Sequence, residues 1–87
     1  MVTKEIKVIV HRFLEELKKR QIPFQKIYLY GSHAHGRAHP DSDIDIAVIC
    51  NHFAGDSVEQ NMILWKIAVK IDPRLAPVSF SPREFQK

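Results

Sequence analysis

The sequence predicts a two-layer α/β fold, with elements in the order α-β-α-β-α-β and a small mixed sheet. Three observations support this fold class. Apolar residues recur at three- and four-residue steps in two long segments, residues 6–17 and 58–69. Short apolar or alternating runs occupy residues 27–30, 43–50 and 75–80. Polar turn residues, glycine or proline separate these segments, so each one is expected to form its own helix or strand.

Length and composition limit the kinds of protein that this chain can be. Its 87 residues suffice for one domain over residues 1–87, and a chain of this size buries only about 60% of its unfolded surface. A partner or a second copy would therefore help to cover its core. No segment approaches the roughly 20 apolar residues that span a bilayer, and no leader pattern is visible, so we expect a cytoplasmic protein with no membrane association. The net charge of +3 suits an anionic ligand.

The first predicted element is a helix that Thr3 can cap. Charged residues cover one side of it, and Glu15 and Glu16 among them favour a solvated face over a nucleic-acid-binding patch. Pro23 ends the helix, because proline disfavours helical geometry in the residue before it. The apolar stripe of this helix consists of Ile6, Val10, Phe13, Leu14 and Leu17.

A strand over residues 27–30 follows, so Gly31-Ser32 lies at a strand end. The next residues leave room for one or two helical turns, closed by a turn at Pro40-Asp41. A second strand over residues 43–50 alternates in character and ends at Cys50, the only cysteine. A single cysteine excludes an internal disulfide, and its apolar neighbours favour a core position over a reactive thiol.

A second long helix is expected to start with a capping box at residues 57–60 and to end at Asp72-Pro73. Its apolar residues cover so much of its circumference that we expect burial on more than one side, against the sheet or against a partner, with core packing as the default for Trp65. A third strand over residues 75–80 contains Pro77, which places it at a sheet edge or a bulge. Residues 81–84 have the pattern of a helix start. The stripe of the second helix comprises Val58, Met62, Trp65 and Val69, widened by Ile63, Ile67 and Ala68.

Asp43 and Asp45 are the first candidates for a functional site. Because the two residues lie two positions apart on a strand, their carboxylates leave the same face of the strand, about 6–7 Å apart. At an effective dielectric of 20, the two negative charges repel by roughly 2–3 kcal/mol. A hard cation such as Mg²⁺ relieves that repulsion. Ile44 and Ile46 point the other way, into the core, which fixes the direction of the aspartates. The alternative is that Ser42 and the aspartates only cap a turn.

The Gly31-Ser32 pair is the second candidate. Glycine lets a phosphate approach the backbone without a Cβ in the way, and the amides that open the next helix offer hydrogen-bond donors. Arg37 can neutralise phosphate charge. His33, His35 and His39 surround it in sequence, and their spacing favours loop solvation or weak phosphate contact over a transition-metal site.

Together, Gly31-Ser32, Gly36, Ser42-Asp43, Asp45 and the apolar residues after them resemble the signature of the minimal nucleotidyltransferases, small members of the DNA polymerase β superfamily. The resemblance implies a two-layer nucleotidyltransferase fold. It also implies that Gly31 and Ser32 hold a triphosphate, with Arg37 and Ser42 as further nucleotide contacts. Asp43 and Asp45 would be the catalytic residues and the ligands of one or two Mg²⁺ ions.

The same resemblance implies an activity and a partner. Family members transfer a nucleoside monophosphate from ATP or another NTP, with pyrophosphate leaving. Minimal members commonly act as antitoxins that adenylylate a small helical HEPN-domain RNase toxin. We therefore expect an NTP and a protein acceptor of this kind, and not a nucleic acid, as the substrates. A nucleic-acid-binding module remains an alternative, which predicts salt-sensitive binding that survives loss of the aspartates.

One position departs from the family pattern and puts the activity in question. Polymerase-β-like sites use a third carboxylate on the strand after the second long helix, and some minimal members carry Arg-Ile-Glu-Pro there. This chain has Arg74-Leu75-Ala76-Pro77, so alanine occupies the carboxylate position. Asp72 or a partner chain could supply the missing group. The alternative function is a catalytically impaired subunit that binds a nucleotide or a toxin without transfer.

Overall fold

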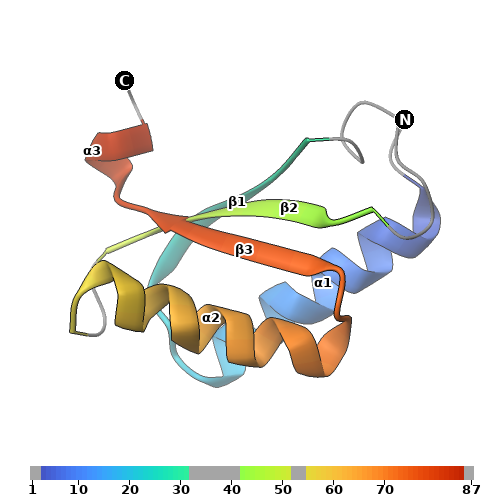
Figure 1. The fold of residues 1–87 in the computed structure, drawn as a ribbon, viewed down its shortest axis with the longest axis horizontal. Coiled ribbons are helices and arrows are strands. Elements are labelled where there is room, and N and C mark those ends of the chain that lie inside the picture. The colour runs from blue at the N-terminus through green and yellow to red at the C-terminus, as the bar shows by residue number, and fades with distance from the viewer. Residues whose placement is uncertain (1–2, 32–41, 52–54, 86–87) are drawn as a thin grey trace.

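The computed structural model describes residues 3–31, 42–51 and 55–85. Within them it confirms the expected α/β fold class, with helices beside a small mixed sheet (Figure 1). The short helix expected after Gly31 lies outside the described residues. The elements are α1 (Lys4–Lys19), β1 (Phe24–Tyr30), β2 (Ile44–Cys50), α2 (Ser57–Ile71), β3 (Leu75–Phe80) and α3 (Pro82–Phe85).

The sheet has the order β1-β2-β3, with β1 antiparallel and β3 parallel to the central β2. The crossover from β2 to β3 runs through α2, as a parallel connection requires. β1 begins three residues earlier than expected, with an irregular register between Phe24 and Lys26, and β2 begins at Ile44, one residue later than expected. β3 lies at an edge of this sheet, where Pro77 costs no ladder hydrogen bond on the outer side.

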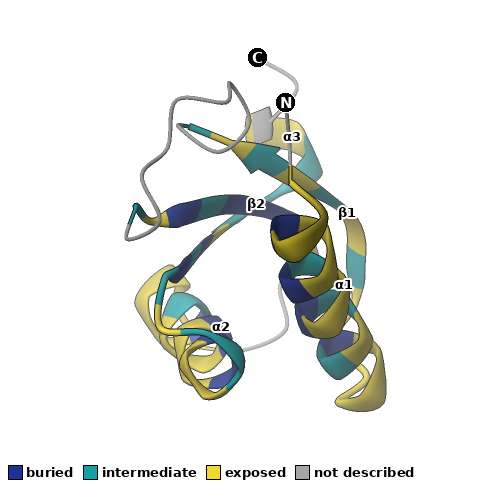
Figure 2. Cartoon of the chain, turned by 90° about the vertical axis from the view of Figure 1, so that its right-hand side faces the viewer, coloured by how far each residue is buried: buried dark blue, intermediate teal, exposed yellow. Residues whose placement is uncertain are grey.

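α1 and α2 pack against the same face of the sheet and form the core with it (Figure 2). The largest fully buried side chains include Phe13 and Leu17 of α1 and Leu64 of α2, and each such side chain stabilises the fold by about 1.5–3 kcal/mol. Ile6, Phe13 and Leu17 are buried as expected, whereas Ile9 takes the buried place expected for Val10 or Leu14. Thr3 caps α1 as expected, with its Oγ1 accepting a hydrogen bond from the Ile6 amide at 3.2 Å.

The start of α2 differs by one residue from the expectation. Asp56, and not Ser57, is the N-cap, and its carboxylate accepts a hydrogen bond from the Glu59 amide at 2.9 Å. Gln60, expected to complete the capping box, is buried against β3, where its Nε2 donates to Ser79 Oγ at 3.3 Å. Asp and Ser cap helices equally well, so cap preference does not choose between Asp56 and Ser57. A capping box starting at Ser57 would need the side chain of Gln60, which is instead bound to Ser79.

The face that α2 buries was also predicted incorrectly. Of the expected apolar residues, Ile67 and Ala68 are buried, together with Gln60 and Leu64, which were not expected. The central stripe, Val58, Met62, Trp65 and Val69, is exposed to solvent. Asn61 fixes this orientation together with Gln60, because its Oδ1 accepts hydrogen bonds from the Ser79 amide at 2.8 Å and from Ser79 Oγ at 2.9 Å. Two polar anchors to β3 therefore turn the side with Leu64 and Ala68 toward the sheet.

The C-terminal segment follows the sequence pattern closely. Ser81 Oγ accepts a hydrogen bond from the Glu84 amide at 3.1 Å, and Glu84 Oε1 accepts one from the Ser81 amide at 2.9 Å. This reciprocal pair is a capping box, which fits the helix start expected at residues 81–84. Cys50 is buried, also as expected, and burial raises the pKa of its thiol. None of the helices in the described ranges has the length and apolar character needed to cross a membrane.

Candidate functional site

The face of the sheet opposite α1 and α2 carries the candidate site. Ile44, Ile46 and Val48 are fully buried on the helix side, so the alternation of β2 directs Asp45 and Ala47 to the opposite face. Asp45 is half-buried there. Asp43 stands immediately before β2 and is exposed, and Ser42 beside it is half-buried.

Gly31 lies against Asp45. β1 ends at Tyr30, which is the register partner of Asp45 on β2. Gly31 follows with φ of 77°, in the left-handed region, and a Cβ added to it would collide with the Asp45 carboxylate, whose Cγ lies 3.1 Å from that position. The chain can make this bend beside the carboxylate only because residue 31 has no side chain. The glycine bend and one of the paired aspartates thus meet in space.

Replacing Gly31 with alanine is expected to destabilise the fold by about 1–3 kcal/mol, because alanine is strained at positive φ and its Cβ displaces Asp45. Urea unfolding measures the loss. Gly55→Ala is the matched control, since a Cβ there would also meet a carboxylate, that of Glu59, but without a positive φ. Equal losses in the two variants would contradict the strain assigned to Gly31.

Ala76 is the neighbour of Asp45 on the other side. In the parallel register of β2 and β3, Asp45 pairs with Ala76, so Tyr30, Asp45 and Ala76 lie side by side across the sheet. Paired residues of neighbouring strands lie about 4.8 Å apart with side chains on one face. A carboxylate at residue 76 would therefore stand next to Asp45. Within the described ranges, no group of three or more His, Cys, Asp or Glu side chains could hold a metal ion.

Asp72 is engaged elsewhere. It ends α2, and its carboxylate accepts hydrogen bonds from Arg74 Nε at 3.1 Å and Nη2 at 2.9 Å, and from the Arg74 amide at 2.8 Å. The Arg74 guanidinium also contacts Glu5 of α1 at 2.8 Å. Hydrogen bonds from Arg74 hold the pKa of Asp72 below its usual value. Through its ion pairs with Asp72 and Glu5, Arg74 joins the end of α2 to α1. The pairing of Asp72 with Arg74 argues against Asp72 as a substitute for the third carboxylate.

Asp72→Asn is expected to lower the free energy of unfolding by about 1–2 kcal/mol at pH 7. Since the folded pKa is lowered, the pair stabilises the fold above about pH 4, the usual unfolded value, and this contribution is lost as the pH falls through the folded pKa. The difference between wild type and variant should therefore shrink in acid, as urea unfolding at several pH values would show. Glu5→Gln, which removes the exposed partner, should cost under about 1 kcal/mol.

An aromatic hollow lies beside Asp45, and we did not predict it from the sequence. Tyr28, Tyr30, Ala47 and Phe80 line a space of about 200 Å³ on the face of the sheet opposite α1 and α2. Partial burial, and then the negative charge of Asp45, raise the pKa of Tyr30. The alternation of residues 27–30 held the signal, because it puts the two tyrosines on one face and Ile27 and Leu29 on the other.

Two of the expected nucleotide contacts, Ser32 and Arg37, lie outside the described residues, as do Gly36 and the three histidines around it. The described part of the expected site is Gly31, Ser42, Asp43 and Asp45. Of these, the structure brings Gly31 and Asp45 into contact and places Ser42 and Asp43 at the entry of β2.

Comparison with known proteins identifies the family of the chain. The family model described as a nucleotidyltransferase domain matches residues 10–87. The protein adenylyltransferase MntA of Shewanella oneidensis is 42% identical over 57 residues, which cover 64% of this chain and 37% of that protein. The chain thus matches well under half of this relative's length. No solved structure matches the chain. The family match spans most of the chain and fits its mixed sheet and helical layer, and the chain therefore belongs to the nucleotidyltransferase domain family.

Proposed function

We propose that this protein, as a single domain over residues 1–87, binds a nucleoside triphosphate with Mg²⁺ and transfers a nucleoside monophosphate to a protein. The observation that carries the proposal is the meeting of the Gly31 bend with the Asp45 carboxylate. Family membership supports nucleotidyl transfer. The name of the relative, a protein adenylyltransferase, supports ATP as the donor, AMP as the group transferred and a protein as the acceptor.

The donor set fits a hard divalent cation. Asp43, immediately before β2, and Asp45, on β2, would supply carboxylate oxygens. Mg²⁺ favours one or two carboxylates together with phosphate oxygens and water. When bound, one or two such ions would neutralise phosphate charge during transfer. Gly31 leaves its backbone open to the phosphates, while Ser32, Arg37 and Ser42 are the proposed further contacts to the nucleotide.

The neighbouring aromatic surface supports nucleotide binding in a second way. Tyr28, Tyr30 and Phe80 line the hollow on the same face as Asp45, and an aromatic ring can contribute about 1–3 kcal/mol by stacking on a base. A nucleotide whose phosphates lie at Gly31 and Asp45 would have this surface within reach.

In the proposed reaction a hydroxyl oxygen of the acceptor bonds to the α-phosphorus, and the bond from that phosphorus to the pyrophosphate oxygen breaks. The hydroxyl proton must leave during this step. Ala76 stands where a carboxylate could accept it, so in this chain the proton would go to solvent or to a carboxylate of a bound partner. The expected rate is correspondingly low.

Ala76 favours a second candidate function, that of a subunit which binds a nucleotide or a toxin without transfer. In both cases we propose a cytoplasmic antitoxin whose partner is a helical HEPN-domain RNase toxin. Transfer of AMP to the toxin distinguishes the first candidate from the second.

One experiment with two readouts tests the proposal. Calorimetric titration of the 87-residue protein with ATP should show binding in Mg²⁺ that EDTA abolishes. Incubation with α-labelled ATP, Mg²⁺ and the toxin should then leave label on the toxin. A complex without label would establish the binding-only function, and the absence of Mg²⁺-dependent ATP binding would refute the site itself.

A further inference from the structure

The outward face of α2 carries an apolar stripe that no described residue covers. We call Val58, Met62, Trp65 and Val69 the outer stripe; they are 70%, 54%, 54% and 39% exposed. Their spacing of four, three and four residues is that of the contact positions of a coiled coil. Four large apolar side chains in one row along a helix indicate a surface for another helix.

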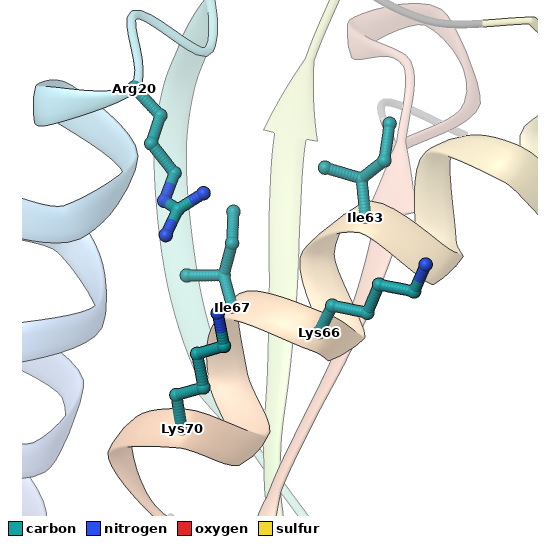
Figure 3. Close-up of a pocket in the computed structure, with 5 residues that line it drawn as sticks. All are labelled: Arg20, Ile63, Lys66, Ile67 and Lys70. Carbon is teal, nitrogen blue, oxygen red and sulfur yellow. The ribbon is translucent and has the colours of Figure 1, made fainter.

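A basic pocket borders the outer stripe on the side toward α1. Its space of about 270 Å³ is lined by Arg20, Lys66 and Lys70 together with Ile63 and Ile67. Figure 3 shows Arg20 reaching from the end of α1 toward Ile67 and Lys70 of α2. Arg20 also pairs with Glu16 at 3.1 Å.

The two lysines of this pocket make no ion pair with a described residue. Both lie on the same flank of α2, four residues apart, so they present a basic edge parallel to the outer stripe.

We infer that the outer stripe and the basic pocket together dock an amphipathic helix of a partner protein, whose apolar row is flanked by Asp or Glu. The apolar row would pack on the outer stripe, and the acidic flank would face Lys66 and Lys70. A second copy of this chain fits less well, because the flank of its own outer stripe carries Lys66 and Lys70, whereas the pocket calls for acidic residues. A nucleic acid would leave the aliphatic residues of the outer stripe, Val58, Met62 and Val69, unused.

The outer stripe and the proposed nucleotide site lie on different sides of the molecule. α2 covers one face of the sheet (Figure 2). Asp45 lies on the opposite face, because Ile44 and Ile46 beside it are buried on the helix side, and Gly31 lies against Asp45. A helix bound to the outer stripe would not cover that face. The inference does not depend on Asp43 or Asp45, so loss of nucleotide binding would not affect it.

Trp65 is the only tryptophan and lies within the outer stripe, so its fluorescence reports on docking directly. The probe is a synthetic helical peptide with leucine at its contact positions and glutamate along both flanks. A second peptide carries lysine in place of glutamate. The acidic peptide should shift the Trp65 emission to shorter wavelength, and the basic peptide should bind at least about tenfold more weakly.

Two variants sharpen this test, with binding measured by the anisotropy of a labelled peptide. Lys66→Glu with Lys70→Glu should weaken binding of the acidic peptide about tenfold or more, while the matched control Lys4→Glu with Lys7→Glu on α1 should not. Trp65→Ser should weaken it about thirtyfold, whereas Val8→Ser, an exposed apolar residue of α1, should have no effect.

Several outcomes would overturn the inference. One is the absence of an emission shift with the acidic peptide up to about 1 mM; another is equal affinity for both peptides. Tighter binding of single-stranded RNA that depends on the two lysines would assign the surface to nucleic acid instead. A dimer in sedimentation that Trp65→Ser dissociates would assign it to a second copy.

Discussion

Asp45→Asn is expected to weaken Mg²⁺-dependent ATP binding by about 100-fold or more, and Asp43→Asn to have a comparable effect. The amide removes one of two negative charges from the proposed ion site, and an amide oxygen is a weaker ligand for Mg²⁺ than a carboxylate. Neither variant should unfold the protein, because Asp43 is exposed and Asp45 only half-buried. Calorimetric titration with ATP in Mg²⁺ measures the affinity, and urea unfolding measures the stability.

Asp56→Asn provides the matched control for these variants. It makes the same change from carboxylate to amide at the N-cap of α2, where asparagine caps as well as aspartate. Its ATP affinity should equal that of the wild type. Undiminished affinity in both Asp43→Asn and Asp45→Asn would rule out the proposed site.

Ala76→Asp is expected to raise the rate of AMP transfer to the acceptor by about 100-fold or more, because it adds the carboxylate that the family pattern has on β3. The register of β2 and β3 places this residue directly beside Asp45. A carboxylate there can accept the proton of the attacking hydroxyl, a contribution of about 10²–10⁴ in rate, or bind a second ion. Transfer of label from α-labelled ATP measures the rate, and a titration with Mg²⁺ should show tighter ion binding.

The control for this gain is Val78→Asp, two residues further along the same face of β3. Residue 78 pairs with Ala47 and not with Asp45, so its carboxylate adds the same charge without joining the paired aspartates. It should leave the transfer rate unchanged. An Ala76→Asp variant that transfers no faster than the wild type would contradict the assignment of Ala76 to the third-carboxylate position.

Local signals in the sequence predicted most of the elements and the direction of the key carboxylate. The spacing of Ile6, Phe13 and Leu17 predicted the buried side of α1, because only one side of that helix is apolar. The alternation of β2 predicted that Asp45 faces away from Ile44 and Ile46. Such patterns depend on residues close together in the chain, where the backbone geometry of a helix or strand relates sequence spacing directly to direction.

The sequence by itself therefore determined the fold class, the helix caps at Thr3 and Ser81 and the face on which Asp45 lies. Only the tertiary structure decided which side of α2 is buried, because that helix is apolar on most sides and its hydrogen bonds to Ser79 select the orientation. The sheet register likewise decided that Gly31 and Ala76 flank Asp45. Strand pairing joins residues distant in the chain, and local spacing does not specify which of them become neighbours.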